Sequence, residues 1–218
     1  MGSKKLKRLN RGAMFVALIL ALVAGVSWFL LTQGYEVGIM KPKQVMNTRN
    51  SIQYKSIEAL MEKADLVVYG KPRNSVRESE TEAFVPETGM AGRFYSAAQF
   101  QVDKTLKGKP EEGPKSAGGS NPTPEANGIK VFQEAYYYEN VLYVLEGYTP
   151  MKKDRSYVLF LRYDRLAGGY WILGEQQGKY NVDGADRAEN EYAVSDEHYK
   201  KLKEELNKLA SEFKLRDK

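Results

Sequence analysis

The chain of 218 residues contains no cysteine and a single histidine. Without cysteine it has no disulfide bonds, no thiolate metal ligands, no thiol nucleophile and no thiol that could carry a lipid. The one histidine, His198, lies in a segment with helical periodicity, and we expect it on a helix surface. No G-x-S-x-G motif accompanies it, so the sequence does not indicate a Ser-His-Asp triad. We therefore expect a non-catalytic protein without a cofactor.

Acidic residues leave one route to catalysis open. Any two of the 28 Asp and Glu residues could converge as the carboxylate pair of a hydrolase, which remains an alternative function. The densest acidic stretch, residues 183–191, carries oxygen ligands of the kind that Ca²⁺ takes. Ala185 and Arg187, however, stand where the EF-hand pattern requires ligands. We interpret this stretch as a polar surface loop and predict no metal site.

The formal charge of +5 does not indicate a nucleic-acid-binding protein. Five of the 33 basic residues precede the long apolar run and no acidic residue does, so the rest of the chain carries 28 basic and 28 acidic side chains. Phosphate binding depends on a concentrated basic surface, whose affinity comes largely from counterion release. The balanced body lacks that signature, and we expect no nucleic-acid partner.

An uncharged apolar run, Ala13–Thr32, follows the basic residues. A helix of about 20 residues crosses the roughly 30 Å hydrocarbon core of a bilayer, and basic flanks stay in the cytoplasm. We therefore expect a cytoplasmic stub at residues 1–12, a single transmembrane signal anchor at 13–32 and a stalk at 33–55. The alternative is a cleaved signal with Val23-Ala24-Gly25 as its cleavage site. The apolar run continues beyond that site as WFLLT, which favours the anchor.

Residues 56–194 show mostly β patterning. Ser56 is a plausible N-cap for a short helix, and ADLVVYG predicts a strand at residues 66–69. We expect long loops at residues 73–92 and 110–128, where apolar periodicity is lost. Further strands are expected where apolar and β-branched residues alternate or run together, at 94–102, 129–132, 157–163, 170–173 and 179–182.

The last segment, residues 195–218, has an apolar stripe at helical spacing. We expect Ser195 to be its N-cap and the stripe to dock on the β domain; the stripe consists of Tyr199, Leu202, Leu206, Leu209 and Phe213. The fold class is therefore mostly β with flanking helices (α+β): a small antiparallel barrel or curled sheet behind an N-terminal transmembrane helix, with a C-terminal amphipathic helix.

The motif order ADLVVYGK, an alternating strand ending in VDKTLKGK, YVLFL and a Gly-bounded hairpin resembles small exported β-barrel domains of bacteria. Their layout is similar to the oligonucleotide/oligosaccharide-binding (OB) type of barrel seen in netrins and tissue inhibitors of metalloproteinases. The resemblance implies a barrel at about residues 64–182 and an extracytoplasmic setting, for which we expect a Gram-positive host. It implies no inhibitory activity, because that activity depends on an N-terminal cysteine and on disulfide bonds.

Tyrosine is the one compositional excess, with 15 residues. Adjacent tyrosines on an extended strand face opposite sides, so at least one face of this region could present rings to a sugar, a peptide or a protein. Tyrosine also suits half-buried strands, which is the simpler explanation. We expect a binding or interaction module of the cell envelope, with an envelope protein or glycan as partner; a structural subunit of a membrane complex is a further alternative. The candidate binding residues are Tyr136, Tyr137, Tyr138, Tyr143 and Tyr148.

Overall fold

The computed structural model describes residues 43–46, 52–84, 93–111 and 128–215. These residues belong to the second of two compact units into which the chain divides, Met1–Lys41 and Pro42–Lys218. The expected cytoplasmic stub and transmembrane anchor, and most of the expected stalk, lie outside the described residues. Within the described ranges, no helix is both long enough and apolar enough to span a membrane.

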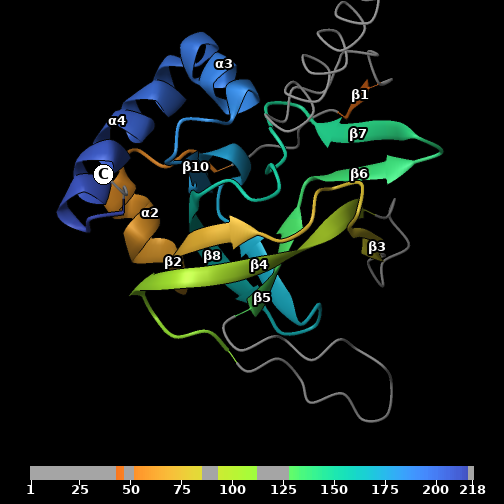
Figure 1. Ribbon diagram of the computed structural model, residues 1–218, viewed down its shortest axis with the longest axis horizontal. Coiled ribbons are helices and arrows are strands. Elements are labelled where there is room, and N and C mark those ends of the chain that lie inside the picture. Colours follow the sequence, from red (N-terminus) through yellow and green to blue (C-terminus); the bar gives the residue numbers. More distant parts are fainter. Residues whose placement is uncertain (1–42, 47–51, 85–92, 112–127, 216–218) are drawn as a thin grey trace, which may run out of the picture. The chain divides into compact units, whose positions relative to one another are not determined.

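A closed barrel of five strands forms the centre of the domain (Figure 1). Around the barrel the strand order is β2 (Leu66–Pro72), β4 (Arg93–Lys107), β5 (Gly128–Gln133), β9 (Gly169–Ile172) and β8 (Tyr157–Asp164), and β8 pairs again with β2. All neighbours are antiparallel except β5 and β9, which are parallel. The prediction of a small antiparallel barrel or curled sheet is therefore wrong for the direction of this one pair. The arrangement is compatible with a small OB-like barrel.

Strand β8 is buried on both faces over its first five residues, as its unbroken apolar sequence predicts. One face contributes Tyr157, Leu159 and Leu161 to the apolar core that fills the barrel. The other face contributes Val158 and Phe160 to a second core between the barrel and the helices. The strand thus joins both cores.

The helices cover the outer face of β2 and β8. Helix α2 (Ile57–Lys63) begins after its N-cap Ser56, whose hydroxyl accepts the Ala59 N–H at 3.3 Å, as predicted. Helix α4 (Glu197–Glu212) buries its apolar stripe in the second core, so the predicted docking is confirmed. Its N-cap is Asp196 rather than Ser195: the Asp196 carboxylate accepts the Tyr199 N–H at 2.9 Å, whereas Ser195 ends the preceding helix and its hydroxyl donates to the Tyr192 carbonyl.

An additional helix, α3 (Arg187–Ser195), precedes α4. It occupies most of the acidic stretch that the sequence analysis assigned to a surface loop, so that interpretation is wrong for residues 187–191. Asp186 is its N-cap, and a short 3₁₀ helix η1 (Glu175–Gly178) and strand β10 (Lys179–Asn181) lie before it in the chain. Buried polar contacts attach this helix to the domain, together with the partly buried Tyr192 and Ala193, which pack against the second core.

A second, smaller sheet contains β1 (Lys43–Met46), β7 (Val141–Leu145) and β6 (Ala135–Tyr138) in that order. Strands β6 and β7 form a hairpin, which Figure 1 shows on the opposite side of the barrel from α4. Strand β1 lies within the predicted stalk and pairs in parallel with β7. Strand β3 (Glu80–Phe84) pairs with β4, so the predicted loop at residues 73–92 is wrong for this part.

Candidate functional site

Three of the five candidate tyrosines share one face of the β6–β7 hairpin. Tyr136 and Tyr143 are cross-strand partners, and their rings stack at 5.0 Å between centroids with 5° between the planes. Tyr138 lies two residues after Tyr136 and therefore on the same face, where 59% of it is exposed. Phe94 of β4 joins them, with its ring 5.5 Å from that of Tyr136 and 49% of the residue exposed. These four residues are called the aromatic face below.

The other two candidate tyrosines lie elsewhere. Tyr137 points to the opposite face of the hairpin, where it packs against the barrel core. The Arg77 guanidinium lies 4.4 Å from the centre of its ring, in a cation–π contact. Tyr148 is buried and donates a hydrogen bond to the Gln133 side-chain oxygen at 3.3 Å. Neither residue belongs to the aromatic face.

The hairpin ends in a strained two-residue turn. Glu139 and Asn140 both have positive φ, 46° and 64°, in the left-handed region that side chains other than Asn, Asp and Gly rarely adopt. The primed turns of two-residue hairpins require this conformation. Arg77 stabilises the turn, because its guanidinium donates to the Asn140 side-chain oxygen at 3.2 Å. One arginine therefore supports both the turn and the inner face of the hairpin.

A second aromatic group lies on the outer face of the barrel. Tyr95, Phe132 and Trp171 come from β4, β5 and β9, and their ring centroids are 4.7 to 4.9 Å apart. Burial and the nearby Glu82 carboxylate raise the pKa of Tyr95 to about 12. Tyr95 and Phe132 are almost fully buried, so their rings are not open to a ligand.

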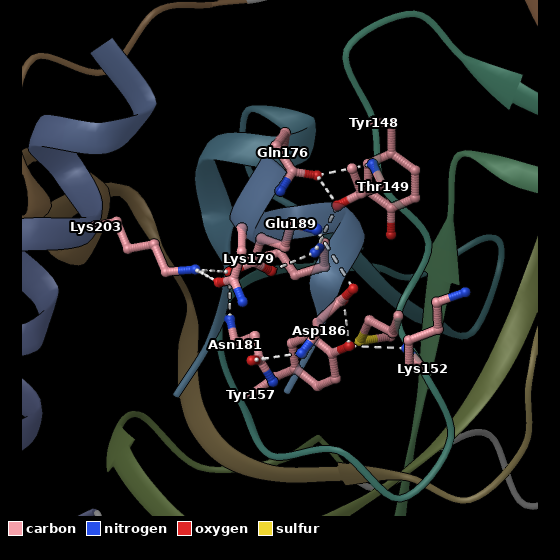
Figure 2. A network of polar contacts seen from close by, with 12 residues as sticks. Tyr148, Thr149, Lys152, Tyr157, Gln176, Lys179, Asn181, Asp186, Glu189 and Lys203 are labelled. Atoms are coloured by element: carbon pink, nitrogen blue, oxygen red, sulfur yellow. Dashed lines mark hydrogen bonds and ion pairs between the residues drawn. The ribbon is translucent and has the colours of Figure 1, made fainter. Parts of the chain in front are cut away.

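A network of buried polar contacts lies between α3, β10 and the β7–β8 connection (Figure 2). At its centre the Lys179 ammonium is 2.7 Å from one oxygen of the Glu189 carboxylate, and both side chains are fully buried. The other Glu189 oxygen accepts from the Lys203 ammonium at 2.9 Å and the Asn181 N–H at 2.7 Å. Burial alone would raise the pKa of Glu189, but the two ammonium groups outweigh it and hold that pKa below its ordinary value.

Asp186 forms the second carboxylate of this network. Its side chain accepts the Tyr157 hydroxyl at 2.7 Å, and that hydroxyl in turn accepts the Lys152 N–H at 2.8 Å. Burial and the Asp186 charge raise the pKa of Tyr157, so the phenol stays protonated and remains a donor. Asp186 and Glu189 are both completely buried. The network is thus closed to a substrate, and its contacts hold α3 on the barrel.

The acidic stretch 183–191 is used for internal hydrogen bonds. Asp183 accepts the backbone N–H groups of Ser156 and Ala185, at 2.7 and 2.9 Å. Burial disfavours the ionised form of the Asp183 carboxylate, whereas these hydrogen bonds favour it. The hydrogen bonds outweigh burial, so the pKa of Asp183 is lowered. Among the residues that the structure describes, no group of three or more His, Cys, Asp or Glu side chains is arranged to hold a metal ion.

A shallow depression borders the network where Gly147, Gly174 and Tyr192 meet, with a cavity volume of about 160 Å³. Small-molecule sites usually enclose roughly 300–1,000 Å³, so this depression is too small for a substrate of ordinary size. Every carboxyl group that shows a shifted pKa in the described ranges has it lowered, whereas a general acid needs a raised one.

Comparisons with protein-family models, with curated proteins and with solved structures find no match for this chain.

Sequence reasoning missed two residues that shape the aromatic face. Phe94 was assigned only to a strand, and Arg77 to a loop with no role. Both lie far in sequence from the tyrosines that they contact, at 42 and 60 residues from Tyr136 and Tyr137. No local pattern reports such a contact. The clustering of tyrosines at residues 136–143, by contrast, was visible in the sequence.

Proposed function

We propose that this chain is a non-catalytic binding module, anchored by one transmembrane helix and displayed outside the cell membrane of a bacterium. The exposed aromatic face is the observation that carries the proposal. Monomeric proteins seldom leave several large rings together on their surface without a partner for them. Phe94, which contacts the Tyr136 ring, and Tyr138 are each about half exposed, so a partner could still remove much of their area from water.

The hairpin has the properties of a preorganised binding element. Its strands are fixed by cross-strand pairing, and Arg77 fixes its turn and its inner face. Tyrosine and phenylalanine lose few side-chain degrees of freedom on binding, and a rigid support reduces the ordering cost further. The aromatic face is therefore suited to contact a partner without rearrangement.

The two alternative functions have less support. A structural subunit that binds its partner through the C-terminal helix would need the apolar stripe of α4, but this stripe is already buried within the domain. An envelope hydrolase would need two accessible carboxyl groups, and the two carboxylates of the buried network, Asp186 and Glu189, cannot serve because both are inaccessible. We therefore retain the binding module as the proposal.

Photocrosslinking in the cells that naturally make this chain tests the proposal. A photoreactive amino acid replaces Tyr138 on the aromatic face or, as the matched control, Val194 on α3, which is 83% exposed. We expect one defined adduct from position 138 and none from position 194. Equal labelling from both positions, or no adduct from position 138, would contradict a binding role for the aromatic face.

A further inference from the structure

Strand β1 connects the N-terminal part of the chain to the sheet that carries the aromatic face. Its residues Lys43–Met46 pair in parallel with Leu142–Leu145 of β7. The Glu146 N–H also donates to the Met46 carbonyl at 2.8 Å. Strand β7 carries Tyr143 of the aromatic face. The chain therefore enters the described domain at the same small sheet.

Only residues 33–42 separate this strand from the apolar run that ends at Thr32. An extended chain covers at most about 3.6 Å per residue, so Lys43 is tethered within roughly 40 Å of Thr32. The headgroup region adds a further layer of only about 5–8 Å on each side of the hydrocarbon core. With the apolar run in a bilayer, the small sheet is held within reach of that bilayer's surface.

The chemistry of the aromatic face fits a lipid interface better than a sugar. The Tyr136 ring stacks face to face on Tyr143 and has the tilted Phe94 ring beside it, so neighbours already occupy one ring face of both stacked tyrosines. A sugar platform needs a free ring face, whereas an interface accepts ring edges together with hydroxyl groups. Tyrosines concentrate at membrane–water interfaces because one end of the side chain is apolar and the other is polar.

We propose that the aromatic face inserts into the outer interface of the membrane that anchors the chain, so that the partner of this site is a phospholipid surface. The inference rests on the proposed function and specifies its ligand. A patch of a few aromatic residues would bind a free membrane only marginally, as a single lipid chain does. The tether makes the contact intramolecular and supplies a high effective concentration, so weak insertion is sufficient to orient the domain.

The absence of cysteine allows a direct test with the full chain, because one introduced thiol can be labelled uniquely. Val141 lies opposite Tyr138 on the aromatic face, and Val141→Cys keeps all four rings in place. Val194→Cys on α3 and Leu166→Cys, 95% exposed in the β8–β9 turn, are matched controls. Each variant is labelled with an environment-sensitive dye and reconstituted into vesicles of phosphatidylcholine and phosphatidylglycerol that contain spin-labelled lipid.

We expect lipid quenching at position 141 to exceed that at positions 194 and 166 several-fold. The double change Phe94→Ser and Tyr138→Ser should abolish this difference, with circular dichroism confirming that the variant is folded. A ten-residue Gly/Ser insertion after Gly38 should reduce the quenching without changing the fold. Equal quenching at all three positions would overturn the membrane inference.

The binding module and its lipid ligand can be rejected independently of each other. Equal quenching together with a defined protein or glycan adduct from Tyr138 in cells would retain the binding module and reject the lipid surface as its ligand. Equal quenching without an adduct would reject both. Quenching that persists in the double serine variant would also overturn the inference, because the rings would then not be responsible for the contact.

Discussion

A fully buried lysine is the most consequential single residue of the described domain. Lys179 has no exposed surface, and its ammonium contacts Glu189 and, at 3.2 Å, the Thr149 hydroxyl. It also lies 5.2 Å from the centre of the Tyr157 ring. Removing Lys179 leaves the fully buried Glu189 carboxylate with Lys203 as its remaining ammonium partner, and breaking a buried pair in this way costs far more than the intact pair contributes.

We therefore expect Lys179→Met to reduce the free energy of unfolding by about 3–5 kcal/mol. The double change Lys179→Met and Glu189→Met should recover part of this loss, since it removes both fully buried charges, although it leaves Lys203 without its carboxylate partner. Chemical denaturation followed by circular dichroism measures both effects. Lys63→Met is the control, because Lys63 and its partner Glu62 are largely exposed and such pairs contribute at most about 1 kcal/mol. Similar losses at Lys63 and Lys179 would contradict the role of burial.

The lowered pKa of Glu189 also predicts how stability depends on pH. Because folding lowers this pKa from its ordinary 4.5, the folded state favours the ionised carboxylate. Its contribution is complete above about pH 5 and is lost as the pH falls through the lower folded-state value. Asp183 and Asp196 shift in the same direction. We expect unfolding free energies from denaturation series to decrease below about pH 4.5; an increase on acidification would contradict the buried ion pair.

At the scale of elements, the β6–β7 turn is a site where stability can be gained. Glu139 occupies a left-handed conformation that costs an ordinary side chain about 1–2 kcal/mol, and asparagine tolerates it better. We expect Glu139→Asn to raise the free energy of unfolding by up to about 1 kcal/mol, as measured by chemical denaturation. Glu204→Asn on the exposed surface of α4 is the control and should be slightly destabilising. Destabilisation by Glu139→Asn would contradict the turn geometry.

Elements with an unambiguous local pattern were predictable. The apolar sequence of Tyr157–Tyr163 and the glycine turn after it predict β8 and β9, and both strands are confirmed. Helix α3 was not predictable from periodicity, because its most buried side chain is the charged Glu189, which pairs with Lys179 of β10, and only Tyr192 and Ala193 add apolar contacts. A buried carboxylate has the same sequence signature as an exposed one. Helix α3 was therefore missed because the partner of its buried carboxylate, Lys179, cannot be identified from any local sequence pattern.

At the scale of the whole molecule, we expect protection of the backbone amides from hydrogen exchange to be highest in the strands that contribute to both cores. Strands β2 and β8 are paired on both sides, and their buried residues belong to both cores. The small sheet has an outer face with exposed rings. We expect amide hydrogen exchange to be slowest in β2 and β8 and markedly faster in β6 and β7. Equal protection of the hairpin and β8 would indicate that the two sheets unfold as one unit.

The architecture itself was predictable only to the level of a barrel with flanking helices. Strand candidates could be counted along the sequence, but the pairing that closes the barrel joins Val131 to Tyr170 and Leu161 to Ile172. These strands are connected by loops, and the length and composition of a loop do not determine which residues of the two strands pair. The parallel β5–β9 pair was missed for this reason, and the aromatic face could not be assembled because Phe94 reaches it from another strand.

The pairing of β2 with β8 also has a consequence for biosynthesis. About 90 residues separate the paired positions, and at the ordinary rate of about 5–20 residues per second the ribosome needs roughly 5–20 s to make them. During this interval β2 has no β8 partner, and α4, which covers it, is made later still. The barrel therefore cannot close until β8 and β9 have been synthesised, and until then the buried face of β2 lacks one of its two neighbouring strands.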